Sequence, residues 1–320
     1  MNDKIAVIGA GIAGLTLATR LQEKGIEVRV FDKGRGVGGR MSSRRTDWGY
    51  IDHGTQYFGL ENDRFRDFIA TYGNILQPWE GRWGLWQDGK LQEDEVEKPR
   101  YVPTKAMNNL CKYLAGDVTV KLETRIIKLV KEDTWTLIDE NNHHYTDFDT
   151  VILTAPVAQS LALLPDNSPL KAQIDGLTML PCYSLMVVPT HKINLPYDGI
   201  KFVHPVLGWL SVNDSKPLRH SAGALVIQSN FNFALDNLMT DSAVVTQQLI
   251  DSVEKIFNIT LNNFLYQSLH LWRYALPAQM NPQGYYYDDS CNLGMCADWC
   301  ANGRVEGAFL SADALAQHLL

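Results

Sequence analysis

The feature that most constrains this chain is a glycine-rich turn close to its N-terminus. Residues 4–8 form a short apolar run typical of a strand, and the sequence GAGIAG follows at residues 9–14. Apolar residues then recur at spacings of three from Leu15 to Leu21, which places them on one face of a helix. A second apolar run follows at residues 27–31. This order of strand, glycine turn, helix and strand predicts a βαβ unit that binds a dinucleotide.

The turn has a chemistry that requires glycine. Backbone must approach a pyrophosphate closely at the N-terminus of a helix, where free N–H groups and the positive end of the dipole attract the anion. Asp32 ends the second strand, where a carboxylate can take a pair of ribose hydroxyls. The turn residues expected at the pyrophosphate are Gly9, Gly11, Ala13 and Gly14. A glycine-rich turn in an unrelated α/β protein is the alternative interpretation.

The composition limits the class of protein and its partners. With 320 residues, of which 45% are hydrophobic and 20% charged, the chain is globular rather than disordered or coiled-coil. The 29 basic against 36 acidic residues give a net charge of -7, so we expect no nucleic-acid partner. The apolar stretch at residues 5–18 is broken by glycines and shorter than a bilayer span of about 20 residues, so we expect no membrane helix and no signal peptide. Five scattered cysteines favour a reduced, cytoplasmic protein.

A second glycine-dense segment, DKGRGVGGRMSS at residues 32–43, is typical of a further phosphate clamp. A domain that binds only a nicotinamide cofactor does not require it. The segment resembles the amine oxidase superfamily of flavoproteins, in which a Gly-Gly-Arg turn closes over the FAD pyrophosphate. The resemblance implies that residues 50–58, with Gln56, run beside the isoalloxazine ring, although a plain strand and turn is the alternative. The cofactor contacts implied in the clamp are Lys33, Gly39, Arg40 and Met41.

The C-terminal segment predicts the other half of a flavin site. A strand ends at Asp298, and a helix begins after Gly303 whose N-terminus can direct backbone N–H groups at the pyrimidine side of a flavin. We expect Asp298 to hold a ribityl or phosphate-linked hydroxyl, unless it only caps that helix. A buried strand that ends at Pro156 suits a cofactor-facing edge. The resemblance implies that the backbone of Ile126 meets the adenine, unless Ile126 is a core isoleucine. The remaining cofactor contacts expected from this reasoning and from the resemblance are Ala155, Arg304, Val305 and Ala308.

The resemblance implies an α/β fold with a Rossmann-type FAD-binding domain and an inserted α+β substrate domain, as in p-hydroxybenzoate hydroxylase. Because the first and last segments must meet in one sheet, the cofactor domain is discontinuous. We expect it to comprise residues 1–58, 101–156 and 284–320, with residues 59–100 and 157–283 in the substrate domain. A helix is predicted at residues 242–257, and strands at residues 182–188, 208–212 and 224–229.

Further motifs at residues 56–58, 209–217, 270–277 and 298–308 resemble renalase-like enzymes, a compact branch of this superfamily. That resemblance implies noncovalent FAD and oxidation of dihydro-NAD(P) isomers reduced at ring carbon 2 or 6. Normal NAD(P)+ and hydrogen peroxide are the implied products, so a reduced nicotinamide dinucleotide isomer and oxygen are the expected partners. A conventional FAD-dependent amine oxidase, with an aromatic cage around the amine, is the main alternative. A flavin-binding protein with a structural or sensing role is the third.

The chemistry of a dihydropyridine indicates which side chains to expect. The ring gives up a hydride and becomes aromatic, so the protein must stack and orient two rings and exclude water, and it needs no strong base. His270, Trp272 and Tyr274 alternate with a period of two and predict one wall of a pocket, unless they are sheet-core aromatics. We expect them to act with the amide of Gln56. We expect Asn213 and Lys216 to bind the carboxamide or the phosphates of the substrate. The alternative is that they lie in a solvated loop. No cysteine has partners at zinc-ligand spacing, so no metal is expected.

Overall fold

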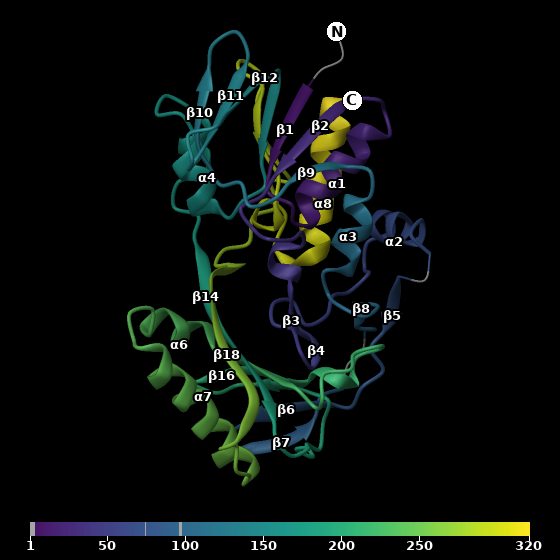
Figure 1. Cartoon of the computed structure of the whole chain (residues 1–320), viewed down its shortest axis with the longest axis vertical. Coiled ribbons are helices and arrows are strands. Elements are labelled where there is room, and N and C mark those ends of the chain that lie inside the picture. The colour runs from purple at the N-terminus through teal and green to yellow at the C-terminus, as the bar shows by residue number, and fades with distance from the viewer. Residues whose placement is uncertain (1–3, 74, 96–97) are drawn as a thin grey trace.

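The computed structural model describes residues 4–73, 75–95 and 98–320, and it has two lobes (Figure 1). The upper lobe in that view holds a parallel sheet flanked by helices, and the lower lobe holds a long curved sheet. The strands β14 (Met179–Pro189) and β18 (Phe264–Pro277) run from one lobe into the other. The chain passes from one lobe to the other more than once, so each lobe contains segments from distant parts of the sequence.

The upper lobe is built on a six-stranded sheet of order β19-β20-β13-β1-β2-β9. Its central strands are parallel, with β1 between β2 and β13, so the βαβ unit predicted at the N-terminus is confirmed. The strands are β1 (Lys4–Ile8), β2 (Glu27–Phe31), β9 (Thr119–Lys121), β13 (Thr150–Leu153), β19 (Tyr286–Asp288) and β20 (Leu293–Met295). Apolar side chains of alternate residues in β1 enter two cores on opposite faces of the sheet, which is why the strand is almost continuously hydrophobic.

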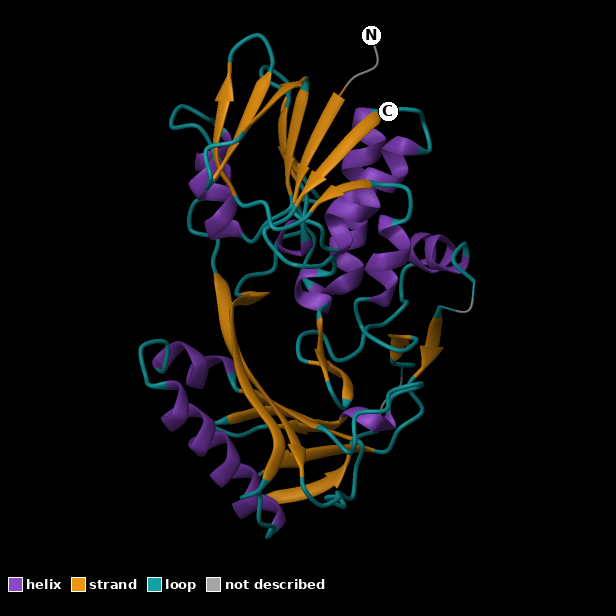
Figure 2. Ribbon diagram, in the orientation of Figure 1, coloured by secondary structure: helices purple, strands orange, loops and turns teal. Residues whose placement is uncertain are grey.

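Helices and a small second sheet cover the two faces (Figure 2). On one face α1 (Ile12–Gln22) packs against α8 (Arg304–Leu319) and α3 (Asn109–Ala115). On the other lie the antiparallel strands β10 (Ile126–Lys131), β11 (Trp135–Asp139) and β12 (His144–Phe148). The N-terminal segment and the C-terminal helix therefore meet in one lobe, as the discontinuous cofactor domain requires.

Three helices that we expected in the substrate domain pack on the upper lobe instead. The rings of Phe65 and Phe68 in α2 (Asp63–Ala70) lie 4.8 and 4.9 Å from the ring of Phe309 in α8. The helices α4 (Val157–Leu163) and α5 (Leu170–Ile174) contact β10 and β19. Their apolar side chains complete the upper-lobe cores, so the expected starts at residues 59 and 157 are too early.

The lower lobe is a seven-stranded sheet of order β18-β14-β17-β16-β15-β6-β7, backed by two helices. The helix predicted at residues 242–257 is confirmed as α7 (Ser242–Phe257), which lies beside α6 (Phe231–Asp236) on the outer face. The remaining strands of the sheet are β6 (Trp83–Gln87), β7 (Lys90–Glu93), β15 (Gly199–Phe202), β16 (Leu207–Val212) and β17 (Leu225–Ser229). The inner face of this sheet turns toward the upper lobe and is the one that concerns function (Figure 2).

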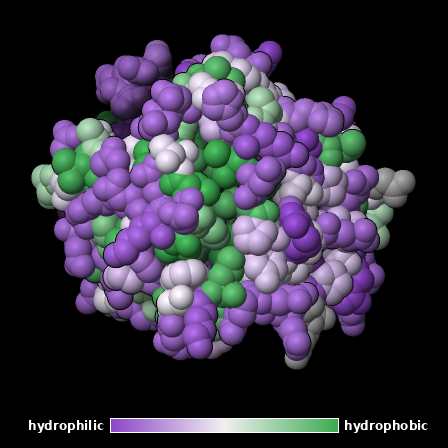
Figure 3. Space-filling model, turned by 90° about the horizontal axis from the view of Figure 1, so that it is seen from below, coloured by the Kyte–Doolittle hydropathy of each residue, from purple (hydrophilic) through white to green (hydrophobic). Residues whose placement is uncertain are grey.

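Two small two-stranded sheets complete the fold. β3 (Ser43–Thr46) pairs with β4 (Gly49–Asp52), and β5 (Leu76–Pro78) pairs with β8 (Tyr101–Pro103). Among the described residues, no helix is long and apolar enough to cross a membrane. The lower end of the molecule is mainly hydrophilic at its surface, with apolar side chains gathered in one central area (Figure 3).

Candidate functional site

The glycine turn after β1 has the shape of an anion cradle. Gly9 has φ of +121°, and a Cβ added to it would lie 2.4 Å from the Thr154 hydroxyl oxygen. A Cβ on Gly14 would lie 2.0 Å from the carbonyl oxygen of Gly9, so both glycines are required by local packing. A Cβ on Gly11 would meet no atom of the described residues within 4 Å. Gly11 therefore leaves the N-terminus of α1 open, where the first N–H groups have no carbonyl partner within the helix.

The second glycine segment lies directly on the first. The N–H of Gly38 donates to the carbonyl oxygen of Ala10 over 2.9 Å, and a Cβ on Gly39 would lie 3.5 Å from the Cα of Gly11. The carboxylate of Asp32 accepts from the N–H groups of Ala10 and Gly34, each over 2.6 Å. Two chain segments predicted separately to bind phosphate thus form one continuous surface, and its open glycine cradle fits a dinucleotide pyrophosphate.

Arg40 and Asp298, which we expected to contact the cofactor separately, are paired with each other. Two hydrogen bonds of 2.7 and 2.5 Å join the Arg40 guanidinium to the carboxylate of Asp298, which is nearly buried. The pair ties the second glycine segment to the start of α8, because the N–H of Gly303 donates to the carbonyl oxygen of Asp298 over 2.7 Å. The alternative in which the Asp298 side chain caps α8 is wrong, since Gly303 is the N-cap and the Asp298 carboxylate accepts from Arg40 instead.

The other expected cofactor residues differ in exposure. Lys33 and Arg304 are exposed, and the Arg304 guanidinium lies 3.7 Å from the carboxylate of Glu61. The carbonyl of Ala155 accepts from the indole N–H of Trp299 over 2.9 Å. Four buried residues of η1 (Gly39–Met41), β10 and α8 supply apolar side chains and backbone rather than charge: Met41, Ile126, Val305 and Ala308. Their predicted cofactor contacts stay predictions.

The inner face of the lower sheet carries a row of side chains that faces the upper lobe. His270 on β18 lies opposite Ser184 on β14, Ser184 lies opposite Gln228 on β17, and Gln228 lies opposite Trp209 on β16. Directly opposite residues of antiparallel strands point to the same face. The Gln228 amide donates to the carbonyl oxygen of Gly54 over 2.7 Å, which fixes the loop after β4 onto this face.

Three rings form a compact cluster at one end of the row. The His53 ring stacks on Trp272 at 5.2 Å and 29°, and His270 lies edge-on to both, at 5.0 Å from His53 and 4.4 Å from Trp272. The Trp272 indole N–H donates to the carbonyl oxygen of His53 over 2.9 Å. The structure thus places His270 and Trp272 together, with His53 beside them, and their expected action on the substrate stays a prediction. Tyr274, further along β18, is half-buried and makes no ring contact with this cluster.

The two imidazoles of this cluster are neutral near pH 7. Burial, with help from His270 and Arg44, lowers the pKa of His53 to about 3. Burial and Arg44 also lower the pKa of His270. Among the described residues, His53 Nδ1 and the Ser184 hydroxyl are buried and have no hydrogen-bond partner. The wall is therefore uncharged, aromatic and short of polar partners, which suits stacking with a bound ring system.

Gln56 is held by four hydrogen bonds within the protein. Its amide nitrogen donates to the carbonyl oxygens of Asp52 and Gly54 over 2.6 and 3.0 Å. Its amide oxygen accepts from the Ser211 hydroxyl over 2.8 Å and from Lys216 Nζ over 3.0 Å. Gln56 therefore locks the loop beside the glycine segments, and its expected catalytic action stays a prediction.

Asn213 and Lys216 are buried, so the alternative of a solvated loop is wrong, and their expected binding to the substrate stays a prediction. Asn213 is fully buried, accepts from the N–H of Asp52 over 3.1 Å, and donates to the Tyr50 carbonyl and the Ser221 hydroxyl. Both the oxygen and the nitrogen of its side-chain amide therefore form hydrogen bonds within the protein. Lys216 is buried because its charge has partners inside the protein, which the sequence does not reveal.

A buried ion cluster surrounds Asp52. One oxygen of its carboxylate lies 3.3 Å from Lys216 Nζ and 3.0 Å from Arg219 Nη2, and all three side chains have no exposed surface. The other oxygen accepts from the Ser43 hydroxyl and the Met107 N–H. Burial raises the pKa of Asp52, but the two cations and these hydrogen bonds outweigh it and lower that pKa to about 2. Burial lowers the pKa of Lys216 to about 8, against the attraction of Asp52.

An aromatic enclosure lies at the other end of the row, and sequence reasoning missed it. The Arg100 guanidinium carbon lies 4.5, 4.0 and 5.5 Å from the ring centres of Tyr57, Trp83 and Trp209, and we call this set the Arg100 cage. Asp94 pairs with Arg100 at 3.2 Å. No spacing in the sequence connects Arg100 with rings from three other segments of the chain.

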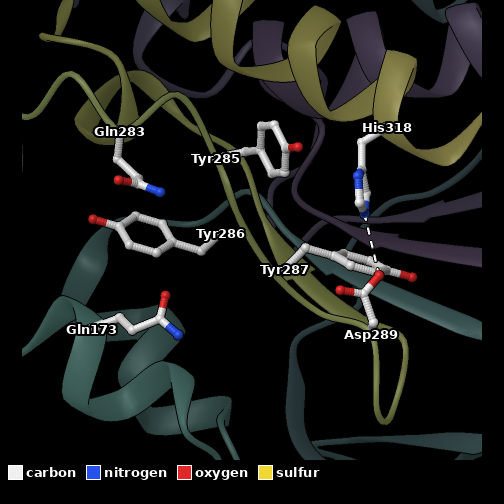
Figure 4. A pocket seen from close by; sticks show the side chains of 7 residues that line it. All are labelled: Gln173, Gln283, Tyr285, Tyr286, Tyr287, Asp289 and His318. Atoms are coloured by element: carbon white, nitrogen blue, oxygen red, sulfur yellow. Dashed lines mark ion pairs between the residues drawn. The ribbon is translucent and has the colours of Figure 1, made fainter.

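A cavity of about 320 Å³ lies elsewhere, beside β19 and the end of α8 (Figure 4). His318 lines it and lies 3.5 Å from the Asp289 carboxylate. The other side chains around it are Gln173, Gln283, Tyr285, Tyr286, Tyr287 and Asp289. It contains none of the residues predicted to bind cofactor or substrate, so we do not regard it as the reaction site.

Comparisons with known proteins agree with this geometry. Residues 7–72 match the model of the NAD(P)-binding Rossmann-like domain, and residues 82–320 match that of the flavin containing amine oxidoreductases. The architecture and the matches define an FAD-dependent oxidoreductase. The chain belongs to the flavin-containing amine oxidoreductase family, and FAD is its cofactor.

Solved structures share the whole fold. A putative protoporphyrinogen oxidase from Exiguobacterium sp. 255-15 superimposes with a TM-score of 0.77 at 15% identity, over 100% of this chain and 99% of that one. A triple mutant of putrescine oxidase, made to redesign cofactor binding, gives a TM-score of 0.75 at 12% identity, over 99% and 98%. At these identities the likeness shows the fold alone.

Curated relatives match a shorter stretch. The 4,4'-diapophytoene desaturase (4,4'-diaponeurosporene-forming) of Staphylococcus aureus strain Newman is 49% identical over 76 residues, which is 24% of this chain and 15% of the desaturase. The same enzyme of strain MRSA252 matches to the same extent. The match thus covers 15% of the length of these relatives, and their activity does not transfer with it.

Proposed function

We propose that this chain is a renalase-like oxidase that converts dihydro-NAD(P) isomers, reduced at ring carbon 2 or 6, into NAD(P)+ with oxygen as the electron acceptor. In the overall reaction, the dihydropyridine loses a hydride and becomes the aromatic pyridinium. Oxygen takes the two electrons and two protons and leaves as hydrogen peroxide. When bound, FAD supplies the hydride acceptor between these two reactants.

The cofactor would be held by the parts of the chain already described. The open N-terminus of α1 and the glycine segment at residues 38–39 suit the pyrophosphate, and Asp32 suits a ribose. The Arg40–Asp298 pair and the N-terminus of α8 close the other end of this surface.

The observation that carries the proposal is the Arg100 cage. An enzyme that oxidises amines is expected to surround its substrate with aromatic rings, and here the rings of Tyr57, Trp83 and Trp209 already surround a guanidinium of the protein. An amine that enters the cage in its protonated form would be repelled by Arg100. The neutral wall of His53, His270 and Trp272 supports the same conclusion, because a dihydropyridine must be stacked and oriented but need not be deprotonated.

A turnover assay tests this proposal. The FAD-loaded enzyme is given each dihydro-NAD isomer, ordinary NADH and a panel of mono- and diamines in air, and NAD+ and hydrogen peroxide are measured. We expect one peroxide for each NAD+ formed from an isomer, and little from NADH. Peroxide from an amine, with none from the isomers, would instead establish the amine oxidase alternative.

A further inference from the structure

The Arg100 cage contains two buried donors that have no hydrogen-bond partner in the part of the chain that the structure describes. Arg100 has only 9% of its side chain exposed, and one guanidinium nitrogen, Nη2, donates to Asp94 over 3.2 Å. Its other terminal nitrogen, Nη1, is buried and has no partner among the described residues. The indole N–H of Trp209, in the same cage, is also buried and unpartnered within that part of the chain. Buried donors are nearly always paired in folded proteins, so two in one enclosure indicate a ligand.

The chemistry of these two groups defines the ligand. An indole N–H and a guanidinium N–H can only donate, so the missing partner is an acceptor. Asp94 pairs with Nη2, and at Nη1 the charged donor favours an oxyanion over a neutral carbonyl. Tyr57 and Trp83 remain half-buried at the border of the cage, so the enclosure is open on that side.

The position of the cage suits a long substrate. Trp209 ends the row of opposite side chains that begins at His270, three strands away. Three spacings of about 4.8 Å place the backbone at the two ends about 14 Å apart, and the long side chains at both ends shorten the span that a ligand must cover. A substrate that contacts both the His53–Trp272 wall and the cage must therefore carry its anionic part away from the ring that stacks.

We propose that the Arg100 cage is a subsite for a phosphate of the substrate, with Arg100 Nη1 and the Trp209 indole as the donors. This subsite rests on the proposed function, because the dihydropyridine ring of the same substrate is expected to stack on the wall of His53, His270 and Trp272. The shared chemistry is a phosphate oxygen, which is found on the 5′ phosphates and also on the 2′ phosphate of NADP. Arg100 is then the residue that selects nucleotides and rejects cationic amines.

Calorimetric titration of the FAD-loaded enzyme tests the subsite without turnover. The matched probes are nicotinamide mononucleotide and nicotinamide riboside, which differ by one phosphate, and 1,4-diaminobutane serves as a cation. We expect the mononucleotide to bind at least tenfold more tightly than the riboside, and the diamine not to compete. Titration with NAD+ and NADP+ then identifies the phosphate, because tighter binding of NADP+ would assign the cage to the 2′ position.

Variants locate the effect at the cage. Arg100→Gln should remove the preference for the phosphate, Arg100→Lys should keep part of it, and Trp209→Phe should weaken it several-fold. The matched control is Arg82→Gln, because Arg82 lies in the same segment but pairs with Asp198 at an exposed position. If Arg100→Gln fails to fold, the preference for the phosphate is measured in the Arg100→Lys and Trp209→Phe variants instead.

Two results would overturn the subsite: equal binding of the two probes by the unaltered enzyme, or a preference that survives Arg100→Gln. The outcome is separable from that of the proposed function. If the mononucleotide binds through Arg100 but no dihydro isomer is oxidised, the subsite stands and the proposed reaction fails. If isomers are oxidised but the probes bind equally, the reaction stands and the subsite fails.

Discussion

Asp52→Asn should destabilise the protein strongly, because the Asp52 carboxylate is the counter-ion of two buried cations. Lys216 and Arg219 lie 3.3 and 3.0 Å from the same carboxylate oxygen, and none of the three side chains is exposed. Breaking such a buried pair by removing one partner costs about 3–5 kcal/mol. The pKa of Asp52, lowered from 3.8 to about 2, corresponds to a stabilisation of about 2 kcal/mol at 1.36 kcal/mol per unit. We therefore expect a loss of about 2–5 kcal/mol in the free energy of unfolding.

The assay is urea unfolding of the FAD-loaded protein at pH 7, followed by tryptophan fluorescence. Asp52→Asn combined with Lys216→Met should lose less than the sum of the two single variants, since the second change removes a cation that the first leaves unpaired. Asp166→Asn is the control, because Asp166 forms an exposed pair with Lys171 and should change little. A loss below about 1 kcal/mol for Asp52→Asn, or simple additivity in the double variant, would refute the reasoning.

Three further predictions follow from the same geometry. Gly11→Ala should lower FAD affinity at least tenfold, measured by flavin content, and should leave unfolding of the apoprotein unchanged. Gly14→Ala should instead destabilise the apoprotein, because its Cβ would lie 2.0 Å from a backbone oxygen. Because the His53 pKa is about 3 in the folded protein and 6.5 in the unfolded chain, stability should fall as the pH drops below 6.5, by about 2 kcal/mol at pH 5. In thermal unfolding, His53→Asn should reduce that slope to the part that the lowered pKa of His270 contributes. Trp272→Ala should slow anaerobic flavin reduction at least tenfold while the enzyme retains flavin, and an unchanged rate would remove Trp272 from the site.

The sequence predicts the cofactor half of the fold well because that half depends on local rules. Glycine spacing, the acid after the second strand and helical periodicity act within the first 32 residues, and the structure places the turn at residues 9–14 at the end of β1 as expected. The helix at residues 242–257 is equally local, since its apolar face follows a single period.

The contacts that decide the chemistry are not local. Arg40 and Asp298 are 258 positions apart, and each residue type suits a cofactor contact on its own, so their pairing has no signal in the sequence. Lys216 follows a polar stretch typical of a solvated loop, and only its contacts with Asp52 and Gln56 explain its burial. The Arg100 cage combines four separate segments of the chain in the same way.

The measurement that tests the central claim most directly is anaerobic mixing of the FAD-loaded enzyme with a single equivalent of reductant, followed by the flavin absorbance. The reductants are the 2- and 6-dihydro-NAD isomers prepared with borohydride, ordinary NADH, and the same panel of amines. We predict rapid bleaching of the flavin by at least one isomer, slow bleaching by NADH and none by the amines. Bleaching by an amine but by neither isomer would contradict the account, and a purified protein that takes up no flavin would contradict its basis.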